Sequence, residues 1–144
     1  MLPSKLILTA RARADLERWE CAGYPRETCG LLVGRATPGA RRVLRVVRAR
    51  NRAAHPEERY ELDPGDHVAA DREARVLGLS IVGFWHSHPD HPAVPSESDR
   101  SAAWEHCSYL IASVSAREVE ELRSWITIAG AIQEEELVWV ELTV

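Results

Sequence analysis

The chain has 144 residues, of which 45% are apolar and 28% charged, and its formal net charge is -4. This length is typical of one globular domain with one hydrophobic core, so we expect a single domain over residues 1–144. The net negative charge argues against a surface that neutralises nucleic-acid phosphates. No stretch approaches the roughly 20 apolar residues of a membrane-spanning helix, and residues 1–9 lack the apolar core and cleavage site of a signal peptide. We therefore expect a soluble, cytoplasmic protein without a membrane or nucleic-acid partner.

The cysteines and the clustered arginines do not indicate a functional site. Cys21, Cys29 and Cys107 are odd in number and show no paired C-x-x-C spacing, so we expect reduced, buried thiols, with a packing role for Cys29. A basic run alternates with valines and a leucine between residues 41 and 52. This alternation is typical of a half-buried strand whose arginines face solvent rather than of a docking site. The arginines concerned are Arg41, Arg42, Arg45, Arg48, Arg50 and Arg52.

The first half of the chain alternates short apolar runs with turn residues. Thr9 is a good helix N-cap and Gly23 a good terminator, which predicts a helix over 10–22 with Leu16 and Trp19 on its buried side. The run Thr-Cys-Gly-Leu-Leu-Val-Gly at 28–34 is typical of a strand buried on both faces. Further strands are predicted over 5–8, 43–49 and 59–62.

The second half begins with a helix predicted over 65–77, opened by Pro64 and ended by Gly78, in which Val68, Ala69, Arg72 and Val76 recur at helical spacing. A second buried strand follows over 80–88, then a proline-rich loop over 89–95 and a short helix that opens at Ser96. Three more strands are predicted over 109–114, 122–128 and 137–144. Hairpin-like neighbours mix with crossovers, so the fold class is mixed α/β (α+β), with a mixed β-sheet and packed helices.

A group of possible metal ligands lies between residues 86 and 99. His86 and His88 are two residues apart on a predicted strand, so both imidazoles point to one side, while Ser87 points to the other and is expected to be structural. With Ser96 as N-cap, Asp99 falls in the first helical turn and can approach both imidazoles across the loop. Two histidines and one carboxylate leave a zinc ion one open position, as in catalytic sites. A solvent-facing histidine pair and a plain capping signature remain the alternatives.

Two separate segments resemble the JAMM (MPN+) metalloprotease family in its short prokaryotic form. One is Pro25-x-Glu27-Thr-Cys-Gly-Leu-Leu-x-Gly34, and the other is Gly83-x-x-His86-Ser-His88-Pro-x6-Ser96-x-x-Asp99. They occur in the family's order, and the segments at 60–63 and 108–114 extend the likeness over most of the chain. The resemblance implies an MPN/JAB domain of the cytidine-deaminase-like kind, with a strongly curved mixed sheet flanked by helices.

The same resemblance implies a role for five side chains. His86, His88 and Asp99 would bind one zinc ion per chain, which would lower the pKa of water at the site to about 7. Glu27 would act as general base and acid, taking a proton from water and passing it to the leaving amine. The Ser96 hydroxyl would hydrogen-bond the oxyanion of the tetrahedral intermediate.

The resemblance also implies a class of substrate. The family cleaves peptide or isopeptide bonds after the C-terminal Gly-Gly of ubiquitin-like proteins, and for short bacterial members the implied partner is a small ubiquitin-like sulfur-carrier protein. A non-catalytic scaffold that binds a ubiquitin-like partner is the alternative, although the retained ligands and base argue against it. A zinc nucleobase deaminase would need a Pro-Cys-x-x-Cys pair, which the sequence lacks.

Overall fold

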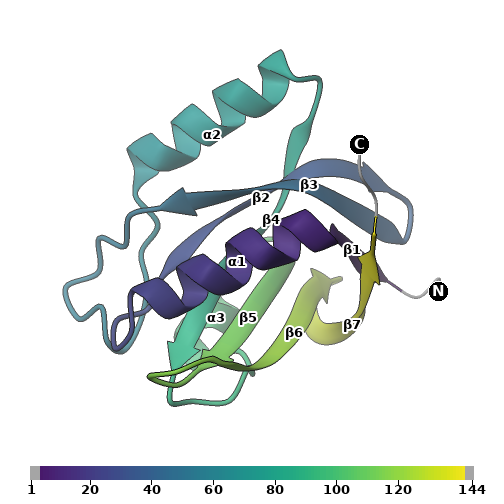
Figure 1. Ribbon diagram of the computed structural model, residues 1–144. Helices are drawn as coiled ribbons and strands as arrows, with labels where there is room; N and C mark the ends of the chain where they lie inside the picture. The colour runs from purple at the N-terminus through teal and green to yellow at the C-terminus, as the bar shows by residue number, and fades with distance from the viewer. Residues whose placement is uncertain (1–3, 142–144) are drawn as a thin grey trace.

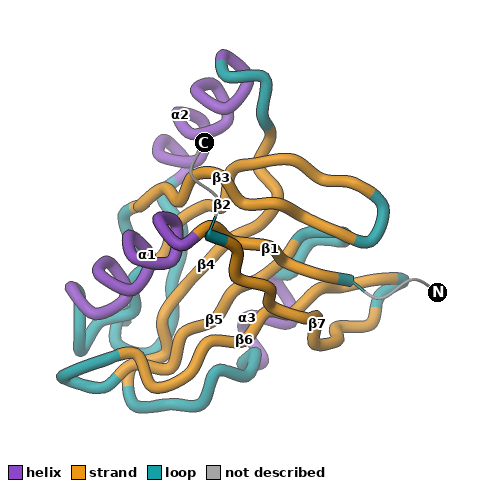
Figure 2. The backbone as a smooth tube through the Cα atoms, turned by 45° about the vertical axis from the view of Figure 1, so that its right-hand side comes forward, coloured by secondary structure: helices purple, strands orange, loops and turns teal. Residues whose placement is uncertain are grey.

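A closed, strongly curved β-sheet forms the framework of the protein (Figure 2). The structure is a computed structural model that describes residues 4–141. Around the sheet the strands follow the order β1-β3-β2-β4-β5-β6-β7, and β1 pairs in parallel with both β3 and β7, which closes the barrel. The strands are β1 (Lys5–Thr9), β2 (Cys29–Thr37), β3 (Ala40–Ala49), β4 (Ser80–Pro89), β5 (Ser108–Val114), β6 (Val119–Ile128) and β7 (Ala131–Val140).

The helices found between residues 4 and 141 are α1 (Ala10–Ala22), α2 (Pro64–Val76) and α3 (Glu97–Ala102). α1 buries Leu16 in one core cluster with Trp85 of β4, whereas α2 buries Ala70 in a second cluster with Phe84 of the same strand. Because neighbouring strand residues point to opposite faces, α1 and α2 cover opposite faces of β4, and Figure 1 shows them lying apart with β2 and β3 between them. None of these helices has the length and apolar character needed to cross a bilayer. The predicted mixed, curved sheet with flanking helices is confirmed.

Most predicted elements are present, although several strands begin earlier than expected. The Thr9 side chain caps α1 by accepting a hydrogen bond from the amide of Ala12, as the sequence indicated. β3 and β7 start before their predicted first residues, 43 and 137, because short turns precede them. Gly39 and Gly130 hold the positive φ angles that such turns require. The pairing of β2 with β3 and that of β6 with β7 therefore continue up to the turns between them. The predicted end of the last strand, residues 142–144, lies outside the described residues.

The predicted strand over 59–62 is wrong. This segment contributes only an isolated bridge between Asn51 and Leu62. Its backbone instead bonds to the Asn51 side chain, whose Nδ2 donates to the carbonyl of Arg59 and whose Oδ1 accepts from the amide of Glu61. A side chain thus satisfies polar groups that a neighbouring strand would otherwise pair.

Two placements of side chains also differ from expectation. In α2 the small residues Ala70 and Ala74 face the sheet, while Val68 and Val76 are 56% and 82% exposed. Small side chains allow the helix to pack closely on the sheet, so the alanines lie on its buried side. The spacing of the valines correctly predicted a helix but did not predict which side of it is buried. Arg41 is buried and donates from Nε to a backbone carbonyl. The other arginines of the basic run are exposed, as expected.

The cysteines are free thiols, as expected. Cys29 is fully buried in the core cluster that α2 covers, which fits its expected packing role. Burial raises the pKa of this thiol to about 12, so it stays protonated at neutral pH. Cys21 and Cys107 are only partly buried, which corrects the expectation of buried thiols at those two positions.

Candidate active site

Three side chains bring one ligand atom each to a common point. His86 and His88 project from the same face of β4, and Asp99 approaches from the first turn of α3. The two Nε2 atoms lie 3.1 Å apart, and Asp99 Oδ2 lies 3.2 Å from His86 Nε2 and 3.1 Å from His88 Nε2. Two ligands bonded to one tetrahedral zinc ion at its usual bond lengths are about 3.3 Å apart. The three atoms are therefore spaced like one face of a zinc tetrahedron.

The protonation of these groups also favours a cation at this point. His88 Nδ1 lies 2.8 Å from the carbonyl oxygen of Pro92, so in the neutral ring this nitrogen carries the proton and Nε2 keeps a lone pair. Burial acts to raise the pKa of Asp99, yet its contacts with His86, His88 and the Ser96 amide lower it overall. An anionic oxygen and an imidazole lone pair at this distance repel each other unless a proton or metal ion lies between them.

His86 is the more deeply placed of the two histidines. Its side chain is fully buried, and burial lowers the pKa of its imidazole, which favours the neutral form that binds metals. The ring stacks on Tyr60, with centroids 4.3 Å apart and planes inclined by 28°. Its Nδ1 has no hydrogen-bond partner among residues 4–141.

Ser96 and Asp99 form a capping box at the start of α3. Ser96 Oγ accepts from the amide of Asp99 at 3.1 Å, and the amide of Ser96 donates to Asp99 Oδ2 at 2.9 Å. The same carboxylate oxygen therefore caps the helix and points at the imidazoles. The cap uses only an acceptor site of the Ser96 hydroxyl, so its own O–H remains able to donate. Ser96 and His88 line a cavity of about 530 Å³ that leads to this point.

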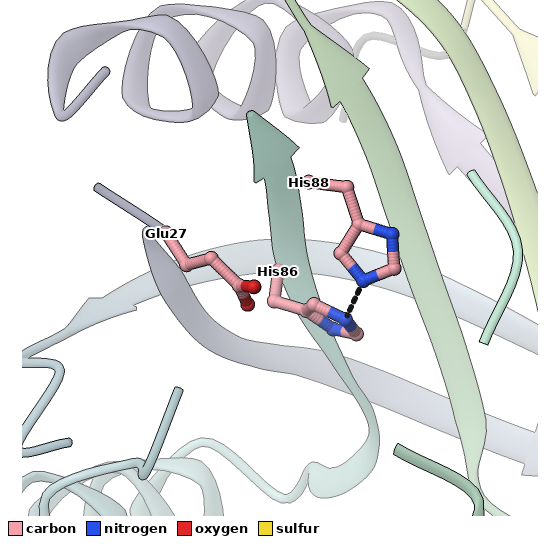
Figure 3. A group of neighbouring side chains, drawn as sticks. All are labelled: Glu27, His86 and His88. Atoms are coloured by element: carbon pink, nitrogen blue, oxygen red, sulfur yellow. Dashed lines mark hydrogen bonds between the residues drawn. The ribbon is translucent and has the colours of Figure 1, made fainter. Parts of the chain in front are cut away.

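Glu27 lies two residues before the start of β2 and extends its carboxylate toward the two imidazoles (Figure 3). One atom each of Glu27, His86 and His88 lie within 4.8 Å of one another. Glu27 is 6% exposed, and Oε1 has no hydrogen-bond partner in the part of the chain that the structure describes. Burial raises the pKa of Glu27 to about 7; the interaction with His88 acts to lower this pKa and the negative charge of Asp99 acts to raise it. A carboxylate in this state can both take up and release a proton near neutral pH.

Backbone pairing sets the position of Glu27 against the histidines. β2 and β4 are antiparallel with Cys29 opposite His86, which places Glu27 across from His88. The amide of Thr28 donates to Ser87 Oγ at 2.8 Å, and the amide of Ser87 donates to the Thr28 carbonyl at 2.9 Å. Ser87 thus ties the two strands together on the side away from the imidazoles, in agreement with its expected structural role.

Comparison with known proteins connects this geometry to a family. Residues 9–127 match the family described as prokaryotic homologs of the JAB domain. The chain belongs to this prokaryotic JAB family. The match confirms the resemblance to JAMM-type proteins and agrees with the curved-sheet fold.

Relatives in this family cover most of the chain. Desampylase from Haloferax volcanii is 40% identical over 122 residues, which are 81% of this chain and 86% of that protein. CysO-cysteine peptidase from Mycobacterium tuberculosis is 31% identical over 135 residues, or 93% and 85% of the two chains. The solution structure of a protein from Desulfitobacterium hafniense superposes with a TM-score of 0.85 at 31% identity, covering 95% of this chain and 94% of that one. The JAB fold thus extends over nearly all of this chain.

The structure brings the sequence-predicted site residues to one place. Asp99 does lie at the third helical position, from which it reaches both imidazoles, and Glu27 lies beside them. Sequence reasoning missed Tyr60 and Asn51 as parts of the site. Tyr60 falls in a segment that resembles the family, but its contact with a ligand depends on a loop conformation that no local pattern indicates.

Proposed function

We propose that the protein is a zinc-dependent peptidase or isopeptidase that cleaves the bond after the C-terminal Gly-Gly of a ubiquitin-like sulfur-carrier protein. The observation that carries this proposal is the triangle of His86 Nε2, His88 Nε2 and Asp99 Oδ2 with a buried carboxylate beside it. Two relatives are named a desampylase and a CysO-cysteine peptidase, which supports a cleavage reaction.

Each site residue then has a distinct task. His86, His88 and Asp99 would hold a zinc ion, which would supply a Lewis acid able to activate water and to polarise the scissile carbonyl. Glu27 takes a proton from the attacking water and delivers it to the leaving amine, a contribution of roughly 10²- to 10⁴-fold in rate. The free O–H of Ser96 donates a hydrogen bond to the developing oxyanion.

The cavity beside these residues suits an extended, narrow peptide. Glu27 and His88 lie at its inner end, and Pro92, Val94 and Pro95 give it an apolar wall. Glycine lacks a side chain, so a Gly-Gly segment can bring its carbonyl close to buried groups that a bulkier residue would not reach. An apolar wall with few polar groups at the reacting end is typical of sites that orient one bond of a larger ligand.

The proposal is tested by measuring metal content and cleavage together. Wild type, Glu27→Gln and a control, Glu120→Gln at an exposed position of β6 outside the cavity, are purified without chelators, and zinc per chain is measured. Each is incubated with a ubiquitin-like sulfur carrier extended by a short peptide beyond Gly-Gly, and with the same carrier ending in Ala-Ala before the peptide. Product masses identify the cleaved bond.

We expect about one zinc ion per chain in all three proteins and cleavage after Gly-Gly by wild type and Glu120→Gln only. Glu27→Gln should bind zinc without cleaving, because Glu27 acts on protons and is not needed to hold the metal. A wild type that binds zinc but cleaves neither carrier would contradict the hydrolase and favour the scaffold alternative. A wild type without zinc would contradict the metal site itself.

A further inference from the structure

The two histidines of the candidate zinc site are supported in different ways. His88 donates from Nδ1 to the Pro92 carbonyl, which fixes both its tautomer and its ring orientation. His86 Nδ1 is buried and lacks any hydrogen-bond partner within residues 4–141. Ligand histidines ordinarily donate their second N–H to an acceptor that holds the ring in place. The orientation of His86 therefore depends on another contact.

That contact is the ring of Tyr60, which stacks on the His86 imidazole with centroids 4.3 Å apart and planes 28° apart. We propose that Tyr60 is a positioning residue whose ring fixes the imidazole plane of His86, so that Nε2 points at the site shared with His88 and Asp99. This inference rests on the proposed zinc site. Without the stacked ring, His86 could turn about its side-chain bonds and carry Nε2 away from the other two ligand atoms.

Two kinds of contact hold Tyr60 in place: the Asn51 side chain, and a backbone hydrogen bond from the Arg52 amide to the Glu61 carbonyl at 2.8 Å. Asn51 Nδ2 donates to the carbonyl of Arg59 at 3.1 Å, and Asn51 Oδ1 accepts from the amide of Glu61 at 3.0 Å, so the carboxamide brackets Tyr60 on both sides. The same Nδ2 donates to the carbonyl of Glu27 at 3.0 Å. A single carboxamide thus connects the segment that supports a metal ligand with the backbone of the proposed general base.

The ring of Tyr60, rather than its hydroxyl, makes this contact. No hydrogen bond joins the hydroxyl to another residue in the described part of the chain. Phenylalanine should therefore replace Tyr60 without loss, whereas leucine fills similar space but offers no flat face to the imidazole. Tyr109 provides a control for the loss of an aromatic ring, since its ring stacks on Phe84 in the cluster against which Tyr60 packs. Unlike Tyr60, Tyr109 also accepts a hydrogen bond through its hydroxyl, from the Trp104 amide at 2.7 Å.

The test measures zinc affinity by chelator competition, and the visible absorption of the cobalt-substituted protein, for Tyr60→Leu, Tyr60→Phe and Tyr109→Leu. We expect Tyr60→Leu to weaken zinc binding about 10- to 100-fold, as is typical when a supporting residue is removed. The cobalt spectrum should change with it. Tyr60→Phe should match wild type, and Tyr109→Leu should lower the melting temperature without changing zinc affinity. Wild-type affinity in Tyr60→Leu, or an equal loss in Tyr109→Leu, would overturn the proposal.

A second variant keeps the proposal testable if Tyr60→Leu does not fold. Asn51→Ser retains a polar side chain but is too short to span the two backbone groups beside Tyr60, so it should weaken zinc binding in the same direction. Unchanged affinity in Asn51→Ser would count against the proposal. These readouts need no substrate. A wild type that binds zinc but does not cleave the carrier would therefore refute the proposed function while leaving the Tyr60 inference to be decided by the affinities.

Discussion

Substitution of Ser96 can separate its capping role from its proposed catalytic role. Its Oγ accepts from the Asp99 amide, and its own O–H is free to donate. Replacing an N-cap serine by alanine costs about 1 kcal/mol of stability, whereas glycine costs only a few tenths. Losing one oxyanion donor costs about 2.7–4 kcal/mol, or roughly 10²- to 10³-fold in kcat. We therefore expect Ser96→Ala to be clearly less stable than Ser96→Gly, while both lose the same 10²- to 10³-fold in kcat.

The assay compares kcat on the extended carrier, the free energy of unfolding in urea and the zinc content of each variant at pH 7. Ser96→Thr retains both the hydroxyl and the cap, so it serves as the control and should stay near wild type. Zinc content should remain about one per chain because Asp99 is unchanged. If Ser96→Gly kept wild-type kcat while Ser96→Ala lost it, the loss of activity would parallel the loss of helix capping. The oxyanion role of Ser96 would then be refuted.

Three further experiments test the framework and the metal site. In Gly30→Ala the new Cβ would lie 1.9 Å from the backbone carbonyl oxygen of Val47, so we expect a loss of about 3 kcal/mol or more in urea unfolding; a loss below about 1 kcal/mol would contradict this packing. Burial raises the pKa of the Glu20 carboxyl well above its usual value of 4.5. Wild type should therefore lose stability as pH rises from this usual value to the raised pKa of the folded state. Glu20→Gln should therefore be more stable than wild type at pH 8, with the difference vanishing near pH 4, while the exposed Glu120→Gln control should show no such trend. Chelation should lower the melting temperature, and zinc at about 100 times its Kd should restore about 2.7 kcal/mol; an unchanged melting temperature would argue against the site.

Local signals in the sequence predict those elements of the fold that local interactions determine. The apolar runs of β2 and β4, the first of them bounded by glycines, indicated buried strands, and Thr9 indicated the start of α1. The segment at 59–62 has a strand-like pattern but forms only one bridge, because the Asn51 side chain binds the Arg59 carbonyl and the Glu61 amide. Closure of the barrel by parallel pairing of β1 with β7 joins the two ends of the chain, and no local pattern encodes a contact of that sequence separation.

In the candidate site, too, some features depend on local sequence and others on contacts between distant segments. The spacing of His86 and His88 and the cap at Ser96 are local features, and the resemblance to the JAMM family identified Glu27 as their partner. The support given by Tyr60 depends on how an irregular segment folds back over β4. Sequence periodicity describes helices and strands, so a contact made by irregular backbone lies beyond what it can predict.

The pairing of β2 with β4 has a consequence for how this protein can change during evolution. Cys29 lies directly opposite His86, so the pairing of β2 with β4 sets how the proposed base, Glu27, approaches the two histidines. The exposed turns at 38–39 and 115–118 lie outside that ladder, and insertions there would leave the chemistry intact while reshaping the surface offered to a partner. A single residue inserted between Glu27 and Cys29 would instead rotate the carboxylate to the face that α1 covers. Partner choice can therefore diversify in the loops of this fold while the proposed reaction stays constant.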